Sequence, residues 1–186
     1  MYYRRRLPHW QPSEKDLFIT WSLHGALPHN RFPPPKALTA GQAFVWMDRF
    51  LDEARHGPTW LRRDDVAKVV VDALQYGADC LRHYDLYAFV IMSNHVHALV
   101  RPHTTTSRLL HSIKGFSARE ANKLLGRSGE PFWQSESYDH WVRDDTEFRR
   151  IRGYIENNPA RAGMVGKADE YRWSSAYAGT NAGVAG

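Results

Sequence analysis

Two histidines separated by one residue, His95 and His97, are the first feature of the sequence that suggests chemistry. They lie in an apolar, β-forming stretch, and side chains alternate between the two faces of a strand, so both imidazoles are expected on one face. Two imidazoles placed this way can bind one divalent metal ion. The alternative is a pair of sheet-face histidines with ordinary hydrogen bonds, because a short His-x-His pattern arises easily in a chain with ten histidines.

A tyrosine and an asparagine four positions apart, Tyr154 and Asn158, form the second feature. The segment around them is predicted to be helical, and at about 100° per residue the two side chains project in nearly the same direction. Tyr154 stands at the edge of the apolar stripe of this helix, which consists of Phe148, Ile151 and Ile155. Each residue also has an ordinary structural explanation: a core-edge contact for Tyr154, and a helix-terminal position before proline for Asn158.

Arginine dominates the positive charge of the chain. The 186 residues include 25 Lys and Arg against 20 Asp and Glu, for a net charge of +5 and a pI near 9.4. Nineteen of the basic residues are arginine, whose forked guanidinium pairs with phosphate oxygens and stacks on bases, so the composition leans toward a nucleic-acid partner. The equal alternative on composition alone is an ordinary solvated surface. The residues expected to contact nucleic acid are Arg4, Arg5, Arg6, Lys114, Arg119, Lys123, Arg149, Arg150, Arg152 and Arg161.

Strand and helix periodicities alternate along the chain and define the elements that must position these residues. β-forming stretches are predicted over 16–24, 85–92, 95–101 and 132–142. Ser93 and Asn94 separate the second and third of these as a hairpin turn. Helices are predicted over 39–54, from Asp64 or Asp65 onward, from just after Thr104–Thr106 to about 126–131, and from an Asp144 or Asp145 cap toward Asn158, before Pro159.

The resulting order is β-α-β-β-α-β followed by a helix, with the first helical region split in two. This order predicts an α+β fold: a ferredoxin-like or RRM-like split βαβ antiparallel sheet, with helices on one face and a C-terminal tyrosine-bearing helix free to dock. The same sheet serves many functions, so fold class does not decide the activity.

Length and composition predict one domain and exclude several classes of protein. We expect a basic N-terminal arm over 1–13, one compact domain over 14–177 and a flexible tail over 178–186. The longest apolar stretch, Tyr87–Met92, is far shorter than the roughly 20 residues of a membrane-spanning helix. The start lacks the apolar region of a secretory signal, and one cysteine, Cys80, excludes an internal disulfide framework. Cytoplasmic residence is therefore expected.

Three motifs together match a known family. They are I-M-S-N-H-V-H-A-L-V from Ile91, F-W-Q-S-E-S-Y-D-H-W-V-R-D-D-T-E-F-R-R-I-R-G-Y-I-E-N-N-P-A-R-A-G-M-V from Phe132, and Y-R-W-S-S-A-Y from Tyr171. In this order and spacing they resemble the REP-associated tyrosine transposases, which belong to the HUH class of single-tyrosine transposases. The resemblance covers about residues 14–177 and makes that segment an HUH transposase-like domain.

The resemblance implies a site and an activity. His95 and His97 would be paired metal ligands, Asn158 would complete the metal site, and Tyr154 would be the nucleophile. Family members act on single-stranded DNA, often beside a hairpin, and form a covalent 5′-phosphotyrosine link with a free 3′-hydroxyl. The expected cofactor is a divalent metal, Mg²⁺ or else Mn²⁺, because the attacking phenol needs a polarised phosphate. The expected partner is single-stranded DNA with hairpin structure, in the cytoplasm at the nucleoid.

Two other functions compete with this interpretation. A catalytically retired relative would bind hairpin DNA or RNA on the same fold without cutting it. A metal-free phosphoesterase built from two His-x-Ser/Thr strands is less compatible with the sequence, which offers only the triplet His103-Thr104-Thr105. Whether the protein is a monomer or a homodimer, and whether its site is assembled within one chain or between two, stays open at the level of sequence.

Overall fold

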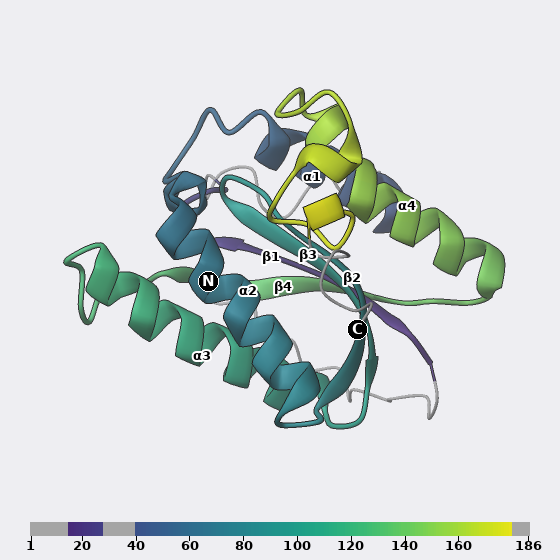
Figure 1. Ribbon diagram of the computed structural model, residues 1–186, viewed down its shortest axis with the longest axis horizontal. Helices are drawn as coiled ribbons and strands as arrows, with labels where there is room; N and C mark the ends of the chain where they lie inside the picture. The colour runs from purple at the N-terminus through teal and green to yellow at the C-terminus, as the bar shows by residue number, and fades with distance from the viewer. Residues whose placement is uncertain (1–14, 28–39, 180–186) are drawn as a thin grey trace.

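A computed structural model describes residues 15–27 and 40–179 (Figure 1). The predicted N-terminal arm with Arg4, Arg5 and Arg6, the first residue of the helix predicted over 39–54 and most of the predicted tail lie outside the described residues. Within the described ranges, no helix is long and apolar enough to cross a membrane.

Four antiparallel strands form a single sheet in the order β2-β3-β1-β4. The strands are β1 (Leu17–Leu23), β2 (Tyr84–Ile91), β3 (His95–Pro102) and β4 (Trp133–Trp141). β1 and β3 are therefore central, and each pairs with its neighbours in antiparallel register. This is the split βαβ arrangement predicted from the sequence, which is confirmed.

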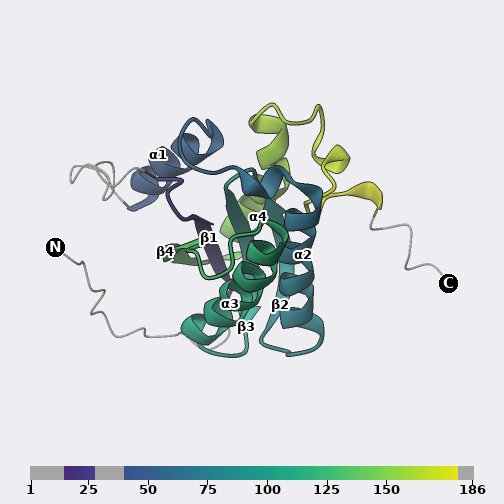
Figure 2. The same cartoon turned by 90° about the vertical axis from the view of Figure 1, so that its left-hand side faces the viewer.

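Helices α2 (Asp64–Asp79) and α3 (Thr106–Leu124) lie side by side over one face of the sheet, preceded by the 3-10 turn η2 (Trp60–Arg62) (Figures 1 and 2). Alternate residues of the central strands point into this layer and form the larger apolar core. From β1 these are Leu17, Ile19, Trp21 and Leu23, and from β3 they are Val96, Ala98 and Val100. The helices that join the strands of the split βαβ unit therefore share one face, as predicted.

Helices α1 (Ala40–Asp52) and α4 (Asp145–Arg161) contribute to a second core on the opposite face. Phe44 of α1 and Ile151 and Ile155 of α4 pack there against Phe18 of β1 and Leu99 of β3. The two parts of the split first helical region thus pack on opposite faces of the sheet. Helix α2 covers the face of the larger core, whereas α1 contributes Phe44 to the core on the other face. The other residues of the central strands, including both candidate histidines, point toward α1 and α4.

The buried stripe of α3 differs in part from the apolar residues of its sequence. Leu109, Ile113, Ser117 and Ala121, each four positions apart, are buried. Phe116 and Leu124 are each 44% exposed, although apolar periodicity alone would place them inside. Ser117 is tolerated in the core because its hydroxyl donates to the Ile113 carbonyl and accepts from the indole N–H of Trp133, so its polar atom is satisfied.

Side-chain caps begin α3 and α4, and the second of these was predicted from the sequence. Thr105 accepts a hydrogen bond from the Arg108 amide, and Asp144 accepts one from the Glu147 amide. Helix α4 continues through Pro159 to Arg161, beyond the predicted end. Proline in the last turn removes only one backbone hydrogen bond, so it does not end the helix there.

The segment after α4 returns to the outer edge of β2. It contains the 3-10 turn η3 (Ala168–Glu170). The amide of Ile91 donates to the Trp173 carbonyl, the amide of Ser175 donates to the Phe89 carbonyl, and Val90 pairs with Ser174 in an isolated bridge. This segment satisfies backbone groups that an edge strand would otherwise present to solvent or to another chain.

Candidate active site and metal centre

The two histidines of β3 are fully buried and face α1 and α4, on the side of the sheet opposite Val96. His97 is opposite Thr20 in the β1–β3 register, and the Thr20 hydroxyl lies 2.7 Å from Nδ1 of His97. Nδ1 of His95 lies 2.8 Å from the Asn94 side-chain oxygen. The outer nitrogens are thus held by neighbours, and the Nε2 atoms point toward each other, 3.1 Å apart.

Asp48, from the inner side of α1, brings a carboxylate to these nitrogens. Its Oδ1 lies 3.1 Å from Nε2 of His97 and 3.7 Å from Nε2 of His95. Asp52, one turn later, places its Oδ1 3.7 Å from Nε2 of His95. Both were missed by sequence reasoning. The available signal was an acid on the apolar side of the predicted helix, between Phe44 and Leu51.

Tyr154 projects from α4 into the same cluster, where its hydroxyl donates a hydrogen bond to Oδ2 of Asp48. Its ring makes edge contacts with the rings of Phe18, Phe44 and His97. The guanidinium of Arg161 lies over the same ring, 4.8 Å from its centre. Aromatic neighbours therefore fix the plane of the phenol, while Asp48 fixes the direction of its hydroxyl.

Asn158 lies one turn after Tyr154 and is fully buried. Its Nδ2 is 3.3 Å from Nε2 of His97, and its Oδ1 has no hydrogen-bond partner among the described residues. The helical spacing thus aims tyrosine and asparagine in the same direction, as predicted, and both meet the His pair. Sequence reasoning did not identify Thr20 and Asn94, which hold the outer nitrogens of the two histidines.

Burial and charge set the protonation of the site. Burial, reinforced by the neighbouring His97, lowers the pKa of His95 to about 3, so this imidazole is neutral near pH 7. Because the Asn94 oxygen can only accept, Nδ1 of His95 carries the proton and Nε2 keeps its lone pair.

The two aspartates of α1 differ in charge. Burial alone would raise the pKa of Asp48, but attraction to His97, His95 and Arg161 outweighs it, and the pKa lies below its ordinary value. Burial and the charge of Asp48 together raise the pKa of Asp52 to about 7. Near pH 7 Asp48 is therefore ionised, whereas Asp52 is about half protonated.

The donor set fits a divalent metal ion. Asp48, His95 and His97 each offer a ligand atom, all within 4.8 Å of one another. Three buried oxygens, on Asp48, Asp52 and Asn158, have no hydrogen-bond partner in the described part of the chain. Buried polar atoms are normally satisfied, so unpaired oxygens that surround two imidazole nitrogens are the arrangement expected of a cation site.

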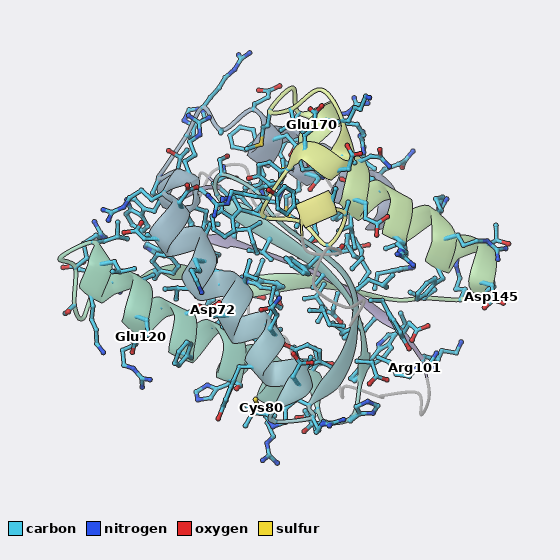
Figure 3. All side chains as sticks on the ribbon, viewed as in Figure 1. Asp72, Cys80, Arg101, Glu120, Asp145 and Glu170 are labelled. Carbon is cyan, nitrogen blue, oxygen red and sulfur yellow. The ribbon has the colours of Figure 1, made fainter. Side chains whose placement is uncertain are left out.

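The predicted DNA-contacting residues of α3 are distributed away from this cluster. Arg119 and Lys123 pair with Glu120, whose label in Figure 3 lies on the far side of the molecule from Asp145 at the start of α4. Lys114 donates to the carbonyls of Gln134 and Ser135, and burial lowers its pKa to about 8. These three residues therefore lie on the face of the sheet opposite Tyr154.

The predicted basic residues of α4 lie closer to the site. Arg161 contacts Tyr154 directly. Arg150 pairs with Glu147 and Arg152 with Glu156, while Arg149 is exposed. The structure thus brings one of the predicted cations to the tyrosine and leaves the other three along the same helix.

Comparisons with known proteins agree with this architecture. The family model of the IS200-like transposases matches residues 62–158, more than half of the chain. Among solved structures, one described as a REP-associated tyrosine transposase bound to a REP hairpin aligns over 100% of this chain and 88% of its own, with a TM-score of 0.58 and 15% sequence identity.

A second solved structure, described as a candidate transposase from Deinococcus radiodurans R1, aligns over 82% of this chain and 97% of its own, with a TM-score of 0.43 and 17% identity. Comparison with curated proteins gives no match. The matched family segment contains the His pair of β3 and both Tyr154 and Asn158 of α4. The chain therefore belongs to the IS200-like transposase family.

Proposed function

We propose that this transposase is a metal-dependent single-stranded DNA endonuclease and strand transferase that acts near DNA hairpins through a covalent 5′-phosphotyrosine intermediate. The observation that carries the proposal is the convergence of Tyr154, Asn158 and the two histidines in one buried cluster. They come from two elements more than 50 residues apart in the sequence, and an apolar core that includes Phe18 and Leu99 lies on the same face of the sheet. Packing alone does not account for this polar set.

Tyr154 is the proposed nucleophile. Its hydroxyl oxygen would form a bond to phosphorus while the bond between phosphorus and the 3′ oxygen breaks, and the proton lost by the phenol balances the one gained by the 3′-hydroxyl. The phosphodiester energy is kept in the new link, so rejoining can run through the same site without ATP. The edge contacts of Phe18, Phe44 and His97 hold the phenol ring for this attack.

His95, His97 and Asn158 are the residues proposed to hold the metal, which we expect to be Mg²⁺, with Mn²⁺ as the alternative. When bound, a divalent cation polarises a phosphate oxygen and stabilises the charge that develops there. Asn94 and Thr20 hold the outer nitrogens of the histidines. Such outer partners fix the ring orientation and the tautomer of a metal-ligating histidine.

DNA with hairpin structure is the proposed partner, at chromosomal DNA in the cytoplasm. The fold resembles that of a protein solved with a REP hairpin, and α4 carries Arg149, Arg150 and Arg152 along the helix that bears Tyr154. Guanidinium groups in this position can pair with backbone phosphates beside the scissile one. The α3 cations Lys114, Arg119 and Lys123, and the N-terminal Arg4, Arg5 and Arg6, are proposed as further phosphate contacts.

The test is a covalent adduct. Hairpins are first selected for binding from a randomised single-stranded pool, and labelled hairpins are then incubated with the protein and Mg²⁺ and separated under denaturing conditions. We expect a protein–DNA adduct that needs Mg²⁺ and disappears in Tyr154→Phe, while hairpin binding remains. Tyr138→Phe is the matched control, since Tyr138 also contacts Phe18 and Phe44 but not Asp48.

Two outcomes would contradict the proposal. An adduct that persists in Tyr154→Phe would exclude this tyrosine as the nucleophile. Tight hairpin binding without an adduct on any selected sequence would favour the catalytically retired binding protein instead.

A further inference from the structure

A single carboxylate, that of Asp48, lies between the proposed nucleophile and the His pair. Oδ2 accepts the hydroxyl hydrogen bond of Tyr154, and Oδ1 faces Nε2 of His97 at 3.1 Å and Nε2 of His95 at 3.7 Å. The residue is 2% exposed. It comes from α1, which lies outside the matched family segment of residues 62–158.

The Oδ1 atom faces the Nε2 atoms of the two histidines and accepts no other hydrogen bond within the described ranges, although the side chain is buried. A buried carboxylate oxygen without such a bond is costly, whereas the other oxygen of the same group is satisfied by Tyr154. The unpaired Oδ1 of Asn158 lies in the same cluster. Two independent buried oxygens are therefore available to a ligand at this place.

The position of Asp48 is fixed independently of Tyr154. The side-chain amide of Asn94 donates to the Leu51 carbonyl near the end of α1, and its oxygen faces Nδ1 of His95. One buried asparagine thus ties the helix of Asp48 to the strand of the His pair. The aromatic contacts of Tyr154 fix its ring, but none of them fixes the direction of its hydroxyl.

We propose that Asp48 is a positioning residue that couples metal binding to the placement of Tyr154: one carboxylate oxygen serves the metal held by the His pair, and the other orients the tyrosine hydroxyl. This inference rests on the proposed function and deepens it. The two oxygens of a carboxylate are covalently fixed to each other, so a cation that holds one of them also restrains whatever the other one binds. Metal binding would then restrain the orientation of the Tyr154 hydroxyl even in the absence of DNA.

The test uses the whole protein without DNA and reads two quantities. One is the affinity for Mg²⁺ by calorimetry. The other is the ¹³C resonance of the Tyr154 ring carbon that bears the hydroxyl, observed in protein labelled at that carbon of tyrosine and assigned by its disappearance in Tyr154→Phe. Asp48→Asn removes the charge with little change in shape. Glu53→Gln is the control, because it removes an exposed carboxylate directly after α1 that pairs with Arg55 and not with the His pair.

We expect the Tyr154 resonance of the wild type to move when Mg²⁺ is added. In Asp48→Asn the Tyr154 resonance should start from a different position and respond little to Mg²⁺. The affinity for Mg²⁺ should fall about ten-fold or more in the same variant. In Glu53→Gln the resonance should start from the wild-type position and still respond to Mg²⁺. If Asp48→Asn does not fold, Asp48→Ser supplies the same comparison.

A wild-type resonance and a wild-type Mg²⁺ response in Asp48→Asn would overturn the inference. Unchanged Mg²⁺ affinity in that variant would do the same. The adduct assay separates this failure from that of the proposed function. If the adduct forms and needs Tyr154 while the Asp48 readouts do not move, only the role of Asp48 is wrong. If the Asp48 readouts move and no adduct forms, only the cleavage chemistry is wrong.

Discussion

The Tyr154 hydroxyl donates a hydrogen bond to Asp48, which lies 106 residues earlier in the same chain. The two residues belong to α4 and α1, the helices that contribute to the second face of the sheet. They meet where His97 of β3 presents Nε2 to both Asp48 and Asn158. A complete set of candidate catalytic groups is therefore assembled within one chain.

Assembly within one chain makes a prediction for mixed variants. His95→Ala lacks part of the metal site and Tyr154→Phe lacks the nucleophile, so neither should form the adduct on hairpin DNA. A mixture of the two should also form none, because each site needs both residues from the same copy. The adduct yield of the mixture is compared with that of wild type diluted with either variant. Recovery of the adduct in the mixture would mean that the tyrosine helix is exchanged between copies.

The sequence was sufficient to predict the sheet, all four strands, the cap of α4, and the shared direction of Tyr154 and Asn158. These features depend on local periodicity, which can be recognised from residues that are close together in the sequence. It was insufficient for Asp48 and Asp52. Helical spacing places Asp48 on the inner side of α1, but only tertiary packing decides that this side faces two histidines nearly 50 residues later. The unexpected exposure of Phe116 has the same cause, since the neighbours of α3 decide which apolar residues it buries.

Asn94 should control the metal affinity without contacting the metal. Its side chain holds Nδ1 of His95 and the Leu51 carbonyl at the same time, so Asn94→Ala frees the ring and leaves two buried partners unpaired. We expect a loss of about 10- to 100-fold in Mg²⁺ affinity, measured by calorimetry. Ser93→Ala, a buried change in the same turn, is the control. Equal Mg²⁺ affinity in Asn94→Ala and wild type would show that His95 is held by packing alone.

Glu147 should make the stability of α4 depend on pH. Hydrogen bonds from Arg143, aided by His140, lower the pKa of Glu147 to about 2 from an ordinary 4.5, against the opposing effect of burial. A lowered pKa means that the carboxylate stabilises the fold above pH 4.5 and loses this contribution as the pH falls toward 2. Glu147→Gln should therefore reduce the free energy of unfolding at pH 7 by about 1–3 kcal/mol.

Denaturant unfolding of wild type and Glu147→Gln at a series of pH values checks this. The difference between them should shrink below pH 4.5 and vanish below pH 2. Glu156→Gln is the control, because Glu156 forms an ion pair with the exposed Arg152, and such pairs contribute little. A difference that stays constant across the pH range would assign the loss to packing rather than to charge.

The edge of β2 should become a site of self-association when its cover is removed. Ser175 binds both backbone groups of Phe89: its amide donates to the carbonyl, and its hydroxyl accepts from the amide at 3.1 Å. Ser175→Pro removes both bonds and leaves the backbone groups of Phe89 unpaired on the outer edge of the strand, beside Val90 and Ile91, which are apolar and buried. Unpaired strand edges of this kind recruit other chains.

We expect Ser175→Pro to lower the free energy of unfolding by about 1–3 kcal/mol and to raise the apparent mass in light scattering as protein concentration increases. Ser175→Ala removes the hydroxyl but keeps the amide bond to Phe89, so it should lose part of the stability and stay at the mass of the wild type. The comparison of the two variants separates the contribution of the backbone hydrogen bond from that of the Ser175 hydroxyl. If Ser175→Pro is destabilised yet keeps the wild-type mass at every concentration, the C-terminal segment supports β2 without protecting its edge. Association in Ser175→Ala alone would instead place the protection in the hydroxyl bond.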